Sequence, residues 1–334
     1  MSIRPLRWQA LALAIVVGVA LISACAGSPA TAPKVYRIGW LSGSTQADTA
    51  AQVDAFRQAM RQLGYIEGGN ITFEVRYADG FLERDAALAA ELVALKVDVI
   101  VTRTTPETLA LKQATSTIPI VAAGVIDPVE IGLVASLARP GGNITGPTGG
   151  GADVAQRRLQ LLKEAVPGAS RVAYLLDASN PSQVRTYQAA QAAAPGLGID
   201  LQPFEVRTPG DFSGAFATIG RTPPDAITLS GSALLRSQLP KILDYIAASR
   251  LPSMTGSDRA YVDGGALMYY NRNEGELSTR AASFVDRIFK GANPAELPME
   301  QPSKFDLIIN MKTAKALGLT IPPSVLAQAT ELIK

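Results

Sequence analysis

Histidine is absent from this chain of 334 residues, and cysteine occurs once, as Cys25. Without histidine there can be no Ser-His-Asp triad, no histidine-ligated zinc and no histidine general base. A single cysteine excludes disulfide bonds within the chain, Cys-x-x-Cys redox pairs and thiolate metal cages. We therefore expect no catalytic residues, no metal site and no cofactor.

Charge is also sparse and balanced. Charged residues make up 18% of the chain, and the net charge of +2 comes from Arg4 and Arg7, because the rest of the chain carries 29 bases and 29 acids. No long basic run is present, so we expect no nucleic-acid partner. With 47% hydrophobic residues the chain can bury a large core, and its length favours two lobes.

The first 34 residues have the pattern of an export signal followed by a tether. The apolar run from Leu11 to Ile22 is short for a membrane span but has the length of a signal-peptide core. It ends in Leu21-Ile-Ser-Ala-Cys25, which resembles a bacterial lipobox, with an ordinary secretory signal or an uncleaved anchor as the alternatives. We predict a lipoprotein signal peptide at 1–24, a flexible tether at 25–34 and lipidation of Cys25, which would anchor the exported protein to a membrane.

From Val35 onward, short runs rich in β-branched residues alternate with longer Ala/Leu-rich segments of helical period, which is typical of parallel α/β units. Similar sequences recur at a nearly constant spacing of about 130 residues, which favours two half-molecules of one topology over generic α/β regularity. Two such sheets would form a ligand crevice at the carboxyl ends of their strands. The predicted strands are Val35 to Leu41, Ile71 to Tyr77, Asp98 to Thr102 and Ile118 to Ala122, then Arg171 to Leu176, Ile199 to Val206, Asp225 to Leu229 and Leu251 to Thr255.

A segment rich in glycine and proline, Arg139 to Gly151, separates the two halves and breaks both periodicities. We interpret it as a crossover, because neither the Lys-Ser/Thr of a P-loop nor a Gly-x-Gly-x-x-Gly after a strand accompanies its glycines. Glu276 to Lys290 and Val325 to Ile333 have amphipathic helical patterns and are predicted to be helices that pack on the lobes.

Eight motifs carry a family likeness: the Cys25 lipobox, Arg37 to Ser42, Leu63 to Gly68, Leu92 to Val101, Ala114 to Ile120, Asp127-Pro128, Ser136 to Gly146 and Lys312 to Leu319. Together they resemble the ABC-importer substrate-binding family that includes tryptophan- and tyrosine-binding lipoproteins. The resemblance implies the type I periplasmic-binding-protein fold, an α/β fold of two Rossmann-like lobes joined by crossover hinge strands, in which hinge closure encloses the ligand. The N-terminal lobe is expected at 35–147 plus about 268–299, and the C-terminal lobe at 148–267 plus about 300–334.

The same resemblance implies the partners. We expect a monomer that binds a small-molecule solute and delivers it to ABC permease subunits, the solute being an amino acid or a similar carboxylate. Tyr269-Tyr270-Asn271 and Thr102 to Thr105 depart from the sequences common in the family at these places, so the resemblance does not fix the solute. A sensory binding protein of the same fold, or an exported α/β enzyme, remains the alternative.

Solute contacts are predicted in the loops that follow the strands, where polar side chains gather. Thr104 and Thr105 precede Pro106, so a helix that starts there could receive an anion at its free N–H groups, or be capped by Thr105. The predicted contacts are Trp40, Ser42, Ser44, Thr104, Thr105, Asp127, Asp177, Asn180, Ser230, Ser232, Arg259, Tyr269 and Asn271.

Several of these residues have a second interpretation. Asp127 could accept a ligand ammonium or organise an Asp-Pro turn. Trp40, Tyr269 and Tyr270 could stack on a planar solute, although aromatic residues beside strands are more often core. Arg259 could pair with a carboxylate, whereas its neighbours Asp258, Asp263 and Glu274 are expected on the solvated surface.

Overall fold

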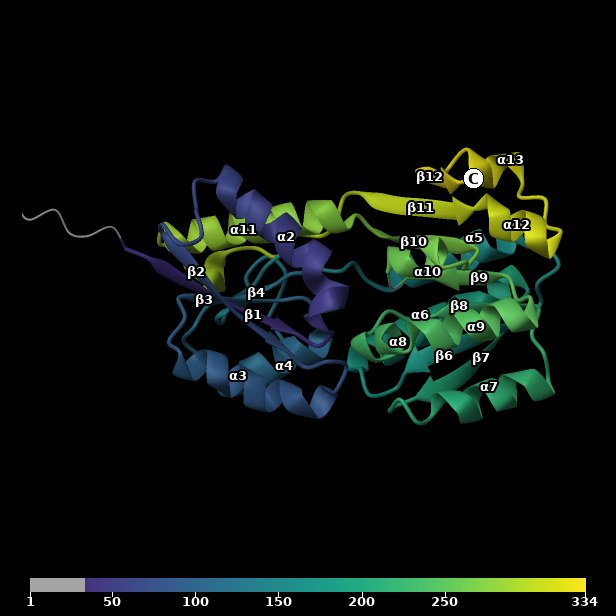
Figure 1. The fold of residues 1–334 in the computed structure, drawn as a ribbon, viewed down its shortest axis with the longest axis horizontal. Coiled ribbons are helices and arrows are strands. Elements are labelled where there is room, and N and C mark those ends of the chain that lie inside the picture. Colours follow the sequence, from purple (N-terminus) through teal and green to yellow (C-terminus); the bar gives the residue numbers. More distant parts are fainter. Residues whose placement is uncertain (1–33, 257) are drawn as a thin grey trace, which may run out of the picture. The chain divides into compact units, whose positions relative to one another are not determined.

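The first lobe is built on a five-stranded parallel sheet of order β2-β1-β3-β4-β5. The structure is a computed structural model, and it describes residues 34–256 and 258–334 apart from the side chain of Ala152 (Figure 1). The predicted signal peptide, Cys25 and nearly all of the tether lie outside the described residues. The strands are β1 (Tyr36–Ser42), β2 (Ile71–Tyr77), β3 (Val99–Thr102), β4 (Ile120–Ala122) and β5 (Ile144–Thr145).

Alternating apolar side chains bury both faces of this sheet. Ile38 and Val99 point into one core and Leu41 and Ile100 into the other, as the two-residue period of a strand requires. One core lies under α2 (Gln46–Gln62) and α11 (Glu274–Phe289), which pack against each other. The opposite face is covered by α3 (Asp85–Ala94) and α4 (Thr105–Ala114) (Figure 1).

The second lobe repeats this topology and extends it. Its seven-stranded sheet has the order β12-β11-β10-β9-β8-β6-β7, so β6 to β9 are arranged as β1 to β4 are. The prediction of two halves of one topology is therefore confirmed. All neighbours are parallel except β10 and β11, which are antiparallel. The strands are β6 (Arg171–Asp177), β7 (Asp200–Val206), β8 (Ala226–Leu229), β9 (Ser253–Thr255), β10 (Met268–Arg272), β11 (Phe305–Asn310) and β12 (Glu331–Ile333).

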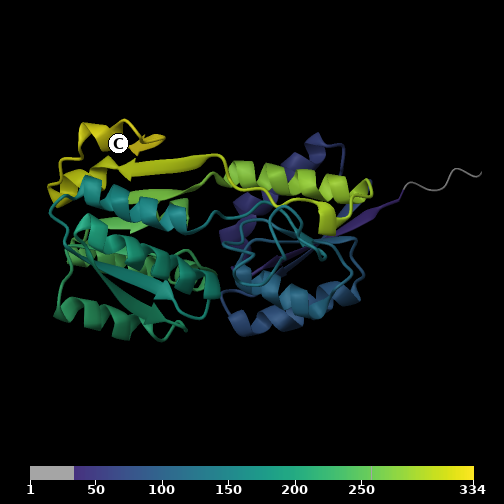
Figure 2. The same ribbon diagram turned by 180° about the vertical axis from the view of Figure 1, so that it is seen from behind.

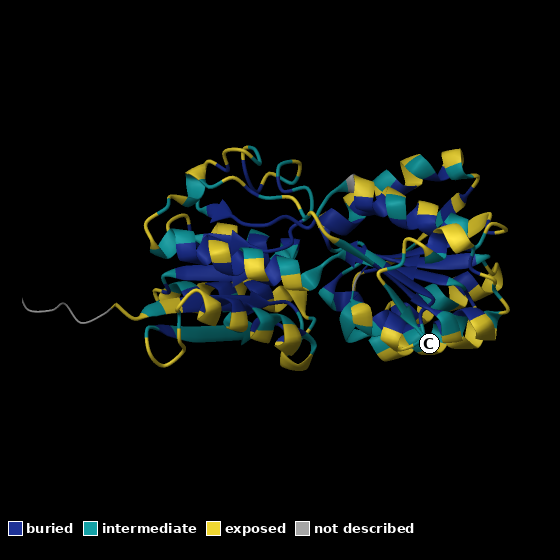
Figure 3. Ribbon diagram, turned by 90° about the horizontal axis from the view of Figure 1, so that it is seen from above, coloured by how far each residue is buried: buried dark blue, intermediate teal, exposed yellow. Residues whose placement is uncertain are grey.

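Helices cover both faces of the second sheet, whose central strands are buried (Figure 3). Short 3-10 turns are found at Leu82–Arg84, Ala194–Leu197 and Pro294–Glu296. The helices are α5 (Ala152–Ala165), α6 (Pro181–Ala193), α7 (Phe212–Arg221), α8 (Ala233–Ser237), α9 (Leu239–Ser249), α10 (Arg259–Asp263), α12 (Met311–Leu317) and α13 (Pro323–Leu326).

Three crossings join the lobes: one after β5, one after β10 and one before β11. Figure 2 shows that α11 lies on the first lobe although the strands before and after it belong to the second. Strand pairing keeps β10 in the second sheet, so the chain returns to the first lobe after Arg272. The boundary expected from the sequence was a few residues earlier, at about residue 268. At the first crossing, a Cβ on Gly149 would lie 2.3 Å from the carbonyl oxygen of Gly124, so only glycine fits there.

The glycine-rich segment from Arg139 to Gly151 contains the first crossing, as predicted, and also the edge strand β5, which pairs with β4. One detail of the sequence-based prediction was wrong. The predicted helix from Val325 to Ile333 is instead the end of the short helix α13 and the strand β12. The chain leaves the helical conformation between them because the N–H and the hydroxyl of Thr330 both donate to Leu307 O in β11, at 2.8 and 3.0 Å, and so start the strand pairing.

Candidate functional site

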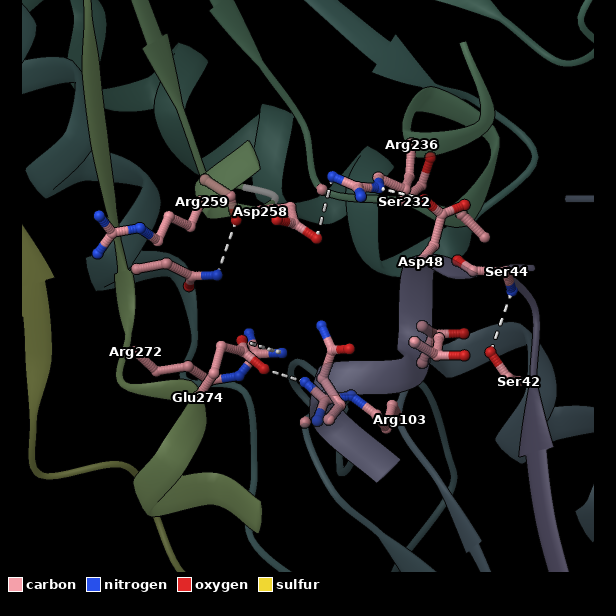
Figure 4. Close-up of a pocket in the computed structure, with 18 of the residues that line it drawn as sticks. Ser42, Ser44, Asp48, Arg103, Ser232, Arg236, Asp258, Arg259, Arg272 and Glu274 are labelled. Atoms are coloured by element: carbon pink, nitrogen blue, oxygen red, sulfur yellow. Dashed lines mark hydrogen bonds and ion pairs between the residues drawn. The ribbon is translucent and has the colours of Figure 1, made fainter. Parts of the chain in front are cut away.

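A cavity of about 490 Å³ lies between the two lobes, at the carboxyl ends of the strands of both sheets (Figure 4). This volume is within the range of small-molecule sites, and the carboxyl edge is where open α/β sheets bind ligands. Eight of the residues predicted to contact solute line this cavity: Ser42, Ser44, Thr104, Thr105, Asn180, Ser232, Arg259 and Asn271.

Three predicted residues lie beneath the cavity and do not line it. Trp40 is buried in the first core with its ring centroid 5.4 Å from that of Phe56. Tyr269 is buried in a small cluster with Ile308, and burial raises the pKa of its phenol above the ordinary value. Ser230 is fully buried and accepts a hydrogen bond of 3.2 Å from the backbone N–H of Asp177. Trp40 and Tyr269 are therefore core residues, which is the second of the two interpretations given for them from the sequence.

Two predicted acids also lie elsewhere. Asp177 lines a second, smaller cavity of about 280 Å³, and its carboxylate accepts a 2.9 Å bond from the N–H of Ser179. Asp127 has a positive φ of 47° in the turn before Pro128. Its carboxylate is 4.0 Å from the guanidinium of Arg185, and burial, aided by the charge of Glu130, raises its pKa above the ordinary value.

Several polar residues that line the cavity also stabilise the ends of helices. Asn180 accepts from the N–H of Ser182 at 3.1 Å and caps α6, and Ser232 accepts from Leu235 at 3.1 Å and caps α8. These bonds fix each side chain where its loop leaves a strand. The hydroxyl of Thr105 lies 2.6 Å from that of Ser182, so this contact joins the two lobes.

The start of α4 already holds a carboxylate. Glu107 is buried and accepts from the N–H groups of Arg103 and Thr104, each at 3.0 Å, and from the hydroxyl of Thr102 at 2.6 Å. A further N–H, that of Gly43, donates to its other oxygen. Glu107 therefore occupies the helix start at which we expected a solute anion, and the cap residue is Thr104, not Thr105.

Arg259 pairs within the protein. Its guanidinium binds both carboxylate oxygens of Glu331 and lies 3.1 Å from Asp263. These hydrogen bonds, that to Glu331 foremost, raise the pKa of the guanidinium above its ordinary value. With 49% of its side chain exposed, Arg259 lies at the rim of the cavity.

The structure also places two ionic groups in the cavity that the sequence did not predict. We call the first the Glu274 triad: Glu274 hydrogen-bonds to Arg103 and lies 3.8 Å from Arg272. Burial opposes the ionisation of Glu274, but the two arginine charges outweigh it and hold its pKa below the ordinary value. Glu274 was expected on the solvated surface; it lines the cavity and pairs with two arginines, with 32% of its side chain exposed.

The second group, which we call the Arg236 triad, joins the lobes. The guanidinium of Arg236, in α8, lies 2.9 Å from Asp48 of α2 and 3.3 Å from Asp258. Asp258 also caps α10 by accepting a 2.8 Å bond from Ala260, and Figure 4 shows it directed at Arg236. One feature of the sequence could have pointed to residues of both triads: Arg103 follows β3 and Asp258 follows β9, so both lie at the carboxyl ends of strands, where the cavity is.

The family model for ABC transporter substrate-binding proteins matches residues 45–333. The chain belongs to this family. This substrate-binding protein is 26% identical over 267 residues, 79% of this chain and 75% of the relative, to the tyrosine-binding protein of Clostridioides difficile (strain R20291). The family is that of the solute receptors of transporters, not of enzymes.

Solved structures show the same architecture. The ABC domain from Streptococcus pneumonia in complex with L-Trp matches 90% of this chain and 100% of its own, with 25% identity and a TM-score of 0.84. A conserved domain protein from Vibrio cholerae o1 biovar eltor matches over the same shares with 26% identity and a TM-score of 0.83. The substrate-binding protein therefore has the two-lobed fold of type I periplasmic binding proteins. No helix in residues 34–256 and 258–334 is both long and apolar enough to cross a membrane.

Proposed function

We propose that this substrate-binding protein is the exported, lipid-anchored solute receptor of an ABC importer, and that its lobes close around a small solute such as an amino acid or a similar carboxylate. The observation that carries the proposal is the cavity between the lobes, whose walls both lobes supply. The eight predicted residues that line it are proposed as solute contacts. Cys25 is proposed as the lipid anchor because of the lipobox that precedes it.

Hinge closure is supported by the contacts that join the lobes across the cavity. Asp48 and Arg236 form an ion pair of 2.9 Å, and Thr105 and Ser182 form a hydrogen bond of 2.6 Å. Each pair would separate if the lobes opened about the three crossings. A solute that touches both walls would add to these contacts and shift the population toward the closed state.

Thermal melting with a panel of solutes tests binding, and small-angle X-ray scattering on each hit tests closure. A solute at a hundredfold excess over Kd should stabilise the protein by about 2.7 kcal/mol. Binding that leaves the scattering profile unchanged from an open form would contradict hinge closure and leave the receptor role intact. A Cys25→Ala variant that fractionates with membranes as fully as the unaltered protein would contradict the lipid anchor.

A sensory receptor of the same fold is the second candidate. Both roles need the same solute site, and they differ in the partner that reads the closed form. Co-purification with ABC permease subunits would support import, whereas capture of a sensor protein in their place would support signalling.

A further inference from the structure

No described residue that lines the cavity is aromatic. Among the described residues that line it, Ile126 is the only apolar side chain larger than alanine. Small-molecule sites that hold apolar ligands are lined mainly by hydrophobic and aromatic side chains. An indole or phenol ring brings about 150–250 Å² of largely apolar surface, and this cavity offers that surface no ring to stack on and few large apolar side chains.

The two ionic groups of the cavity carry opposite charge. The Arg236 triad holds two carboxylates and one guanidinium, so its net charge is −1. The Glu274 triad holds two guanidinium groups and one carboxylate, so its net charge is +1. Figure 4 shows the two triads facing each other from opposite sides of the opening. Two further acids line the cavity: Glu107 is already satisfied by its four hydrogen-bond donors, and Asp263 lies 3.1 Å from Arg259.

Polar atoms at the cavity wall also lack partners. Asn271 Oδ1 and Ser278 Oγ have no hydrogen-bond partner within the described residues. Both residues are buried, with 2% of the surface of Asn271 and 3% of that of Ser278 exposed. The Nε of Arg272 is likewise without a hydrogen-bond partner. All three residues line the cavity. An unsatisfied buried polar atom costs about 1–3 kcal/mol, and these three residues add to the polar character of the wall.

We propose that this cavity binds a small polar zwitterion, with its cationic group against Asp48 and Asp258 and its carboxylate against Arg103 and Arg272, and that it discriminates against aromatic amino acids. The inference rests on the proposed receptor function and narrows it to one solute class and one orientation. It separates this protein from its relatives described as binding tyrosine or solved with L-Trp.

The first test is calorimetry of the purified protein with the twenty protein amino acids, γ-aminobutyrate, glycine betaine and the neutral polyol allitol. The expected result is that a polar, non-aromatic zwitterion binds tightest. Tightest binding of L-tryptophan, L-tyrosine or allitol would overturn the inference while upholding the receptor function. A panel without any binder would also overturn it, and native mass spectrometry of solute carried through purification would then decide whether the receptor function survives.

The second test fixes the orientation. Asp258→Asn keeps the helix cap, because asparagine caps as well as aspartate does, and removes one negative charge. Arg272→Gln removes one positive charge while Arg103 still pairs with Glu274. Each variant should weaken binding of the tightest amino acid of the panel by at least about tenfold, since a hydrogen bond to a charged group contributes about 1.5–3 kcal/mol.

Modified probes separate the two charges. The N-acetyl derivative of the tightest amino acid has no cation, so Asp258→Asn should bind it as well as the unaltered protein does. The carboxamide of the same amino acid has no carboxylate, so Arg272→Gln should bind it as well as the unaltered protein does. Asp54→Asn and Arg84→Gln, which remove members of exposed ion pairs, are matched controls that should bind as the unaltered protein does. If Asp258→Asn does not fold, Asp48→Asn makes the same test. Equal losses for parent and derivative, or no loss, would overturn the orientation.

Discussion

Asp85, the first residue of α3, should make the stability of this substrate-binding protein depend on pH. The residue is 3% exposed, and neither carboxyl oxygen has a hydrogen-bond partner within the described residues. Burial, together with the charges of Glu107 and Glu83, raises its pKa to about 8. The folded protein therefore holds this carboxyl protonated at neutral pH, whereas the unfolded chain ionises it at an ordinary aspartate pKa near 4.

The sign and size of the effect follow from the difference in bound protons. Between about pH 4 and about pH 8 the folded state binds one proton more than the unfolded state, so the free energy of unfolding falls as pH rises, by up to about 1.4 kcal/mol per unit. The stabilisation is complete below the unfolded pKa and is lost as pH rises through the folded pKa. From about pH 5 to about pH 8 the loss due to Asp85 amounts to at most about 4 kcal/mol.

Asp85→Asn removes the titrating group and keeps its shape. Urea unfolding at a series of pH values between about 5 and 9 should show that the variant lacks this decline, so its advantage over the unaltered protein grows as pH rises. Glu83→Gln, at an exposed neighbouring position, is the control and should keep most of the slope. Identical slopes for Asp85→Asn and the unaltered protein would refute the assignment of a raised pKa to Asp85.

Three further predictions concern stability. Phe284→Ala in α11 should cost about 3–5 kcal/mol in urea unfolding, and a cost below about 1 kcal/mol would contradict the packing described. Gly149→Ala should lower Tm because its methyl would meet Gly124 O, while Gly168→Ala, with nothing near its Cβ, should not; equal melting of both would disprove the close approach. Asp225→Ala should lower the free energy of unfolding at neutral pH, since two backbone N–H groups and a hydroxyl hold the pKa of Asp225 low. The difference in stability between the variant and the unaltered protein should vanish in acid as the carboxylate protonates. A difference that stays constant with pH would exclude this dependence on the protonation of Asp225.

The repeat could be predicted because its recurring motif has a physical cause. Asp98 accepts the N–H of Arg37 at 2.8 Å where β1 starts, and Asp225 accepts that of Arg171 at 2.8 Å where β6 starts. Each carboxylate joins the starts of two neighbouring strands, β1 and β3 in the first lobe and β6 and β8 in the second. The two halves therefore have an aspartate at the same place. The strand β12 could not be predicted, because Val325 to Ile333 carries a helical pattern and the strand forms by pairing with β11, where Ile308 faces Glu331.

The position of the cavity could be predicted because loops at the carboxyl ends of parallel strands converge. The two triads could not, because they depend on how the lobes approach. Asp48 and Arg236 lie 188 positions apart and on different lobes, and no local pattern pairs them. Trp40 could have been placed in the core, since it shares the inward face of β1 with Ile38.

The return of α11 to the first lobe sets the order in which the molecule can be completed during synthesis. Leu277 and Phe284 of α11 pack in the same core as Val53 and Phe56 of α2, yet the ribosome makes them after the strands β6 to β10. The first lobe therefore lacks α11 while most of the second lobe is being made, and α11 cannot cover the apolar face of α2 until that interval ends. Domains that fold strictly from the N-terminus onward have no such interval; here the late helix completes the early lobe.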